Sequence, residues 1–361
     1  MIPVTKTFLP PQEAYQAYLD KIWESGWLTN NGQFELELAK QLSGYLDVAH
    51  IELVSNGTLA LQLAIRALGL TGEIITTPFT YVATATAIAW ENCTPVFVDI
   101  DQRTLCIDPA QIEAAITPKT SAILPVHVYG YACDVQRIAK IAERYNLKVI
   151  YDAAHCFGVR LNGQSLLHWG DIATLSFHAT KLFHTAEGGA LVCRQEEVAR
   201  RVYLMKKFGH IGEEDYREIG INAKMSELHA AMGLCVLPLM DGILARRRQI
   251  CERYDDLIAG SGLARPLLTP GLDYNYAYYP VVFPSHQAMT RTREALAAGE
   301  IFPRRYFYPS LNTLPYLQQA GYRACPVSED MAQRVLCLPL YNDLSDGDVE
   351  RIAAIVRKAA S

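Results

Sequence analysis

The chain has 361 residues, 50% of them hydrophobic and 20% charged, which predicts a globular protein with one large and one smaller domain. Its net charge of −5 argues against a nucleic-acid surface, and no apolar run approaches the roughly 20 residues needed to span a bilayer. Nine scattered cysteines without a C-x-x-C pair indicate neither a disulfide framework nor a metal site, and the missing signal-peptide pattern predicts a cytoplasmic protein.

Helical and strand-like segments follow one another in a regular order. Apolar spacing predicts amphipathic helices over residues 11–25 and around Phe34 to Tyr45. The expected strands after them lie at 51–54, 73–77, 95–101, 122–130, 149–152 and 172–177. Helical segments separate most of these strands up to residue 181, which argues for a parallel α/β sheet buried on both faces.

Two strand ends carry residues suited to a ligand. Ser55-Asn56-Gly57-Thr58 joins a strand to a helix N-terminus, where free N–H groups and the helix dipole bind phosphate. The alternative is a plain helix cap. Tyr81 at the next junction is placed to stack on a flat ring, although such an aromatic residue is more often part of the core.

A carboxylate and a lysine end two later strands. Asp152 follows Val149-Ile150-Tyr151, and Lys181 follows the run from Ile172 to Phe177. This pair suits pyridoxal phosphate, since a lysine binds its aldehyde and an aspartate keeps its ring nitrogen protonated. A lone lysine would be an ordinary surface residue. The carboxyl ends of the strands, however, also carry further polar and aromatic residues, namely Gly57, Thr58, Tyr81, His127 and Ser176.

The C-terminal part has a different composition. The stretch 209–221 is predicted to be an exposed loop, and Arg246–Arg248 a solvated helix face. We expect a large domain over residues 1–240 and a small one over 241–361, with a tyrosine-rich strand from Tyr274 to Phe283. Further expected elements there are a helix over 287–298, a strand over 335–340 and a final helix from Ser345.

These segments together resemble the DegT/DnrJ/StrS-type nucleotide-sugar aminotransferases, a branch of the fold type I pyridoxal-phosphate enzymes. The stretches that carry the resemblance are 55–58, 78–84, 125–130, 151–155, 176–189 and 220–225. They span nearly the whole chain in the family's order. The resemblance implies a mostly parallel central sheet flanked by helices, a smaller α+β C-terminal domain, and a homodimer with active sites at the interface.

The resemblance also implies roles for single residues. Lys181 would bind the cofactor and move the proton, and Asp152 would pair with the ring nitrogen. Tyr81 would stack on the ring, with His155 near its phenolic side. The phosphate would be held by Gly57, Thr58 and Ser176, and by Asn222 of the partner subunit, for which a helix cap is the alternative.

The substrate side carries a weaker pattern. Arg305, Tyr306 and Tyr308 lie where relatives contact substrate, but this chain has Asn312 where the matching motif often has histidine. Further candidates for the sugar pocket are His178, His184, Glu187 and Lys224. For each of them, a position in a surrounding loop or behind the residues that touch the substrate is an equal alternative.

The resemblance implies an aminotransferase that uses L-glutamate and a nucleotide-linked 4-keto-6-deoxyhexose to make a 4-amino-4,6-dideoxyhexose. Synthesis of O-antigen, another surface polysaccharide or a glycosylated natural product would be the setting. A C3 keto-sugar or cyclitol aminotransferase would keep the same cofactor residues. A related sugar dehydratase would carry histidine at the Lys181 position, and a non-catalytic sensor or scaffold would have lost the Lys–Asp pair.

Overall fold

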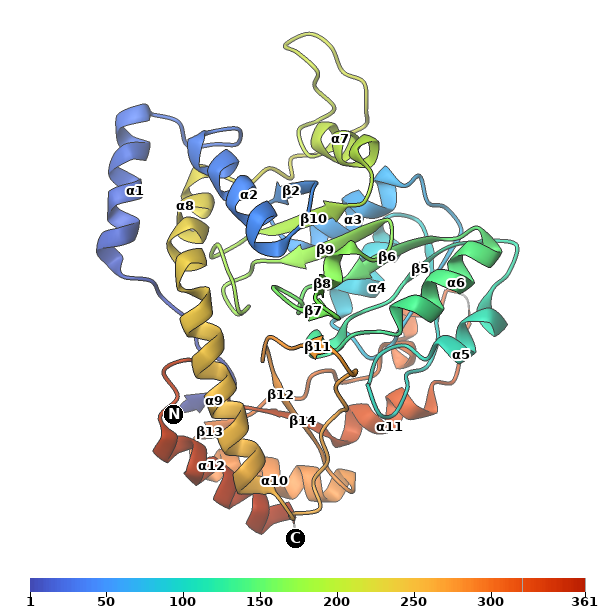
Figure 1. Ribbon diagram of the computed structural model, residues 1–361. Helices are drawn as coiled ribbons and strands as arrows, with labels where there is room; N and C mark the ends of the chain where they lie inside the picture. Colours follow the sequence, from blue (N-terminus) through green and yellow to red (C-terminus); the bar gives the residue numbers. More distant parts are fainter. Residues whose placement is uncertain (320, 361) are drawn as a thin grey trace.

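The computed structural model describes residues 1–319 and 321–360 (Figure 1). A seven-stranded sheet lies at the centre of the large lobe. In spatial order its strands are β2 (Ile51–Val54), β10 (Gly189–Cys193), β9 (Ile172–Ser176), β6 (Lys148–Asp152), β5 (Thr120–Leu124), β3 (Glu73–Thr76) and β4 (Thr94–Phe97). Among them β10 runs antiparallel to its neighbours β2 and β9, while the other paired strands are parallel. The expected mostly parallel sheet is confirmed.

Helices cover both faces of this sheet because successive strand residues point to opposite sides. In β6, Val149 and Tyr151 pack into one hydrophobic cluster, and Ile150 packs into another. The first cluster includes side chains of α2 (Gln33–Leu46), α6 (Val135–Tyr145) and α8 (Glu227–Val236). The second includes those of α3 (Gly57–Ala67), α4 (Val82–Trp90) and α7 (Glu196–Met205).

One expected strand is shorter than predicted. The run 122–130 continues β5 only to Leu124, because Pro125 has no N–H for the ladder. The chain then turns through a short 3₁₀ segment in which Tyr129 adopts a φ of 57°. This turn brings the Tyr129 backbone N–H beside the His155 ring.

The C-terminal part has a hydrophobic core of its own. It is built by α9 (Met240–Ile258), β12 (Tyr279–Val282), α10 (His286–Ala298), β14 (Val335–Leu338) and α12 (Asp346–Ala360). The strand expected over 274–283 is therefore limited to β12, which pairs antiparallel with β14. Before β12 the chain bends at Tyr276, whose φ is 52°.

The N-terminus lies with this second core. Strand β1 (Ile2–Pro3) pairs in parallel with β13 (Ile301–Phe302), and Ile2 is buried in the C-terminal cluster. The expected domain boundary after residue 240 stays a prediction, but the first strand belongs with the smaller core. The other elements are α1 (Gln12–Ser25), α5 (Pro109–Ile112), α11 (Pro326–Arg334), β7 (Arg160–Leu161), β8 (Gln164–Ser165) and β11 (Leu272–Asp273).

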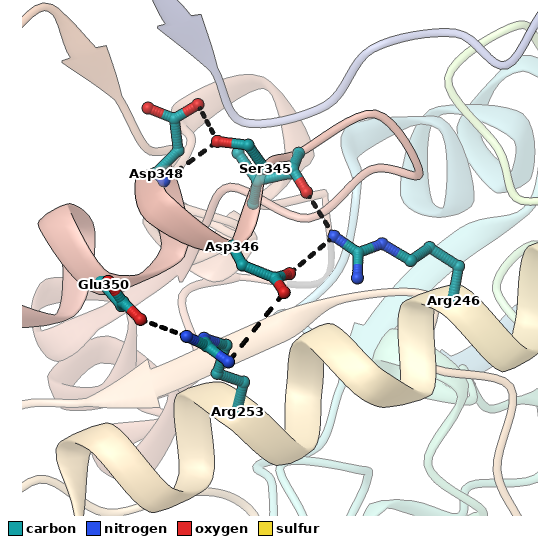
Figure 2. Close-up of polar contacts among 7 residues, drawn as sticks. Arg246, Arg253, Ser345, Asp346, Asp348 and Glu350 are labelled. Atoms are coloured by element: carbon teal, nitrogen blue, oxygen red, sulfur yellow. Dashed lines mark hydrogen bonds and ion pairs between the residues drawn. The ribbon is translucent and has the colours of Figure 1, made fainter.

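Charged side chains tie the start of α12 to α9 (Figure 2). Arg246 donates to Asp346 at 2.9 Å, and Arg253 pairs with Glu350 one turn further along α12. Ser345 caps the helix by accepting a backbone N–H of the first turn at 3.1 Å. Because the carboxylates of these pairs are about half exposed, solvent screens them and each pair contributes little to the stability of the fold.

The middle residue of the run Arg246–Arg248 contradicts the predicted solvated face. Arg247 is buried and donates to the backbone carbonyls of Tyr276 at 2.9 Å and Ala277 at 2.7 Å. Its guanidinium forms hydrogen bonds with the backbone carbonyls of the bend that precedes β12.

The helical stretch Glu227–Ile258 is long and apolar enough to cross a membrane, by length and composition alone. Half of its most apolar 18-residue segment (50%) is buried inside the protein, however, as can also occur in a core helix.

Candidate functional site

A cavity of about 340 Å³ opens at the carboxyl ends of β6 and β9. One wall includes the starts of α3 and α4, and the opposite wall comes from the C-terminal part. The predicted cofactor residues that line it are Gly57, Thr58, Tyr81, Asp152, His155, Ser176 and Lys181. The structure therefore brings these side chains together at the edge of a parallel sheet where ligands bind.

The start of α3 forms an anion site at one end of the cavity. Asn56 caps the helix, because its side chain accepts the N–H of Leu59 at 2.8 Å and its carbonyl accepts that of Ala60 at 3.2 Å. Among the described residues, the N–H groups of Gly57 and Thr58 have no protein acceptor. These two donors and the helix dipole favour a phosphate group.

Glycine is required where this helix meets the end of β9. A Cβ on Gly57 would lie 2.9 Å from the Cβ of Ser176. Gly189 at the start of β10 is equally confined, since its Cβ would lie 2.7 Å from the carbonyl carbon of Asn56. The glycines at these positions let the helix start, β9 and β10 approach closely enough to form the anion site.

Asp152 ends β6 as a buried carboxylate. Its Oδ2 accepts the Thr84 hydroxyl at 2.8 Å, and its Oδ1 accepts the N–H of Ala154 at 3.1 Å. Burial raises the pKa of Asp152, whereas these two hydrogen bonds and the nearby Lys181 act to lower it. The carboxylate is thus fixed in position by groups that favour its ionised form.

Lys181 lies on the connection between β9 and β10. Its Nζ donates to the hydroxyl of Tyr278 at 3.5 Å. Burial lowers the pKa of Lys181 to about 8, although the charges of Asp152 and Tyr81 act in the opposite direction. About a tenth of this amine is therefore neutral at pH 7, far more than for an ordinary lysine, and the neutral form is the one that a nucleophile or base requires.

His155 is held as a neutral ring with a defined tautomer. Its Nδ1 accepts the backbone N–H of Tyr129 at 3.1 Å, so the ring proton is on Nε2. The ring lies against Tyr278 and Phe307, with centroids 4.8 and 5.9 Å away. Burial lowers the pKa of His155 well below its usual value, and Lys181 lowers it further. His155 therefore offers Nε2–H as a hydrogen-bond donor.

Three predicted substrate residues, His178, Glu187 and Tyr306, line the cavity. The His178 Nε2 lies 3.5 Å from the Glu187 carboxylate, and both side chains are about half exposed. Tyr81, also in the cavity wall, is 57% exposed at the start of α4. This side of the cavity is open to solvent.

Other predicted residues do not line this cavity. His184 is buried, donates from Nε2 to the carbonyl of Phe8 at 2.6 Å and accepts the N–H of Ala186. Both ring nitrogens are thus engaged with backbone, so His184 holds the N-terminal segment against the Lys181 loop. His127, expected at the same rim, is buried and stacks on Tyr151 at 4.6 Å.

Arg305 and Tyr308 also lie outside the cavity lining, and they contact each other instead. Asn222 and Lys224 lie after the loop that follows α7, where Lys224 donates to the Asn222 side chain at 2.6 Å. Neither lines the cavity.

The structure adds lining residues that the sequence analysis did not select: Thr84, Tyr278, Arg304 and Phe307. Thr84 could have been found, because it follows Tyr81 by three residues on one helix and so shares its face. The other three come from the C-terminal part and reach the cavity only through tertiary packing.

These residues fit pyridoxal phosphate. The two free N–H groups at α3 suit its phosphate, the hydrogen-bonded carboxylate of Asp152 suits its ring nitrogen, and the Lys181 amine suits its aldehyde. His155 Nε2–H suits its phenolic oxygen. All four groups belong to one cavity.

Comparisons with known proteins show what the whole chain is similar to. The profile of the DegT/DnrJ/EryC1/StrS aminotransferase family matches residues 11–357. A relative from Shigella dysenteriae, named dTDP-4-amino-4,6-dideoxy-D-glucose transaminase, is 44% identical over 360 residues, which are 98% of this chain and 98% of the relative. The crystal structure of DesI with its TDP-sugar product matches with a TM-score of 0.93 at 34% identity, over 99% of this chain and 93% of that chain.

A third comparison concerns the cofactor. The PLP form of Spr1654 from Streptococcus pneumoniae matches with a TM-score of 0.92 at 27% identity, over 99% of this chain and 97% of that one. The profile match spans nearly the whole chain, and the relatives are similar over their full length. The chain belongs to the DegT/DnrJ/EryC1/StrS aminotransferase family.

Proposed function

We propose that the protein is a pyridoxal-phosphate-dependent aminotransferase that moves the amino group of L-glutamate onto a nucleotide-linked 4-keto-6-deoxyhexose. The product is the nucleotide-linked 4-amino-4,6-dideoxyhexose. One observation carries this proposal: Lys181 and Asp152 share a cavity with the anion site at the start of α3. The name of the Shigella dysenteriae relative and the TDP-sugar in the DesI structure support a dTDP-sugar acceptor.

When bound, pyridoxal phosphate supplies an electron sink that stabilises negative charge on the carbon bearing the amino group. Asp152 keeps the ring nitrogen protonated, and Thr84 and the N–H of Ala154 hold its carboxylate in place. The N–H groups of Gly57 and Thr58, with Ser176, hold the phosphate. His155 donates its Nε2–H to the phenolic oxygen.

Lys181 transfers the proton in both half-reactions. Its amine would remove a proton from the α-carbon of glutamate and would later give one to the aminated sugar carbon. A pKa of about 8, set by burial, allows the amine both to accept and to release this proton near neutral pH. Tyr81, at the open side of the cavity, stacks on the cofactor ring.

We further propose a homodimer in which Asn222 of one protomer completes the phosphate site of the other. Helix α1 packs against α8 at one side of the large lobe, and the loop over 206–222 projects from it (Figure 1). Large apolar side chains are exposed on α1, just after it, on α2 and on the projecting loop: Trp23, Trp27, Leu28, Leu36, Tyr216 and Ile219. Such surfaces favour burial against a second copy. The proposed setting is amino-sugar synthesis for O-antigen or another surface polysaccharide, in the cytoplasm.

The first test is the absorption spectrum of the purified holoenzyme before and after addition of L-glutamate alone. We expect the band of the lysine-bound cofactor to be replaced by that of the aminated cofactor, and Lys181→Ala to abolish the change. A panel of nucleotide 4-keto and 3-keto sugars, with product analysis, then tests the acceptor. An unchanged spectrum with glutamate would contradict the donor, and amination only of 3-keto sugars would contradict the position.

A further inference from the structure

Two neighbouring arginines on the C-terminal side of the cavity have different surroundings. Arg304 lines the cavity, whereas Arg305 does not. The guanidinium of Arg305 lies 3.4 Å from the centre of the Tyr308 ring and donates to the carbonyl of Ala332 at 3.2 Å. Of the two side chains, only that of Arg304 faces the substrates.

Backbone pairing fixes this difference. Arg304 donates its N–H to the carbonyl of Cys337 in β14 at 3.1 Å and accepts the N–H of Cys337 at 2.9 Å. Residues in such an extended pairing alternate between opposite sides of the strand. The register with β14 therefore directs Arg304 toward the cavity and Arg305 away from it.

Arg304 carries a positive charge without an anionic partner. Among the described residues it forms no ion pair, and its guanidinium lies 5.1 Å from the centre of the Tyr306 ring. Each of the other charged side chains that line the cavity, Asp152, Lys181 and Glu187, has a polar or charged partner close by. His178 lies 3.5 Å from Glu187, and Asp152 raises the pKa of Lys181.

The wall that carries Arg304 continues to the reacting lysine. Tyr306 meets Tyr278 edge-on with ring centroids 5.6 Å apart, and the Tyr278 hydroxyl lies 3.5 Å from the Lys181 Nζ. A substrate whose reacting carbon lies at Lys181 can thus extend along two tyrosine rings to the guanidinium.

We propose that Arg304 binds the anionic group of a substrate, either a carboxylate of the amino donor or the diphosphate of the nucleotide sugar. This inference rests on the proposed function, since both proposed substrates are anions. A guanidinium binds carboxylate and phosphate through paired hydrogen bonds, which lysine does not reproduce. Arg304 is then a binding residue that the neighbouring Arg305 cannot replace.

The test measures binding of two unreactive probes, succinate and dTDP, to the holoenzyme by calorimetry. Arg304→Gln should weaken binding of at least one probe by about 10- to 100-fold, the usual effect of losing a hydrogen-bonded charge. Arg304→Lys should weaken it less, because the charge remains. Arg305→Gln is the matched control and should change neither dissociation constant by more than about twofold.

Loss of succinate binding assigns Arg304 to the donor carboxylate, and loss of dTDP binding assigns it to the diphosphate. Equal binding by Arg304→Gln and the wild-type protein, or equal losses in Arg304→Gln and Arg305→Gln, would overturn the proposal. Circular dichroism tests whether each variant is folded. If Arg304→Gln does not fold, the binding of the two probes to Arg304→Lys is compared with the wild-type protein instead. The proposed function has a separate test: it would be contradicted if L-glutamate left the absorption spectrum of the wild-type holoenzyme unchanged.

Discussion

Three ionisable side chains in the cavity influence one another. Burial lowers the pKa of Lys181 to about 8, and the neighbouring Asp152 carboxylate opposes this shift. Burial and Lys181 together keep His155 neutral, because they lower its pKa well below the usual value. The lysine, with a pKa of about 8, therefore changes charge close to neutral pH, and it is the group proposed to carry the proton.

The capture of pyridoxal phosphate by the cofactor-free protein should follow the titration of Lys181. We expect its rate constant to rise with pH around a midpoint near 8, because the neutral amine is the reactive form. Asp152→Asn should lower the midpoint, since it removes a charge that raises this pKa. Stopped-flow absorbance measures the rate, and Lys148→Ala, at an exposed lysine outside the cavity, is the control. A midpoint near 10.5 would contradict the role of burial.

At the scale of elements, the start of α3 is set by its contact with β9. Gly57→Ala should weaken retention of the cofactor about 10- to 100-fold, because the new Cβ would lie 2.9 Å from that of Ser176 and would displace the two free N–H groups. Dissociation of the cofactor is followed by absorbance during dialysis.

The matched control is Gly44→Ala on α2, where an added Cβ meets nothing within 4 Å. It should leave cofactor retention unchanged and stabilise the helix by about 0.5 kcal/mol. Equal retention in both variants would show that the close approach at Gly57 is not needed for the anion site.

A buried ion triad joins three other elements. Lys206, just after α7, contacts Glu35 of α2 at 3.2 Å and Glu52 of β2 at 3.0 Å, and its side chain is 4% exposed. Although burial alone would lower the pKa of Lys206, the two carboxylates raise it. The carbonyl of Lys206 also accepts the N–H of Ala223, so this residue anchors both ends of the projecting loop.

Lys206→Met should lower the free energy of unfolding by about 3–5 kcal/mol, because it leaves two carboxylates without their buried partner. Lys207→Met, one residue further, is the control, and it should cost less than about 1 kcal/mol because that amine forms no ion pair among the described residues and lies over the Tyr203 ring, 4.1 Å from its centre. Urea denaturation followed by circular dichroism measures both. Similar midpoints for the two variants would contradict a structural role for the triad.

At the scale of the whole molecule, the proposed dimer makes Asn222 and Lys181 of one protomer parts of different sites. Lys181→Ala and Asn222→Ala chains should each be inactive alone. When they are mixed, half of the randomly formed dimers contain one chain of each kind, and each of these dimers has one intact site of its two. The mixture should therefore recover about a quarter of the wild-type activity. Co-refolded mixtures are assayed by the glutamate half-reaction, with light scattering to confirm the dimer. No recovery in the mixture would place Asn222 in the site of its own chain or outside any site.

The sequence by itself determined the features that depend on local chemistry. Alternating strand and helix patterns predict the parallel sheet because a segment buried on both faces must be apolar throughout. Asp152, Lys181 and the Gly57-Thr58 turn were found because residues at the carboxyl ends of parallel strands meet at one edge, whatever else the chain does. Such positions follow from connectivity alone.

Only the tertiary structure decided the wall that the C-terminal part contributes. Whether Arg304 or Arg305 faces the cavity depends on register with β14, and a shift of one residue would exchange them. Tyr278 reaches Lys181 across 97 residues of sequence, and Arg247 is buried because distant carbonyls meet its guanidinium. Local patterns cannot predict these contacts, since each joins residues that are far apart in the sequence.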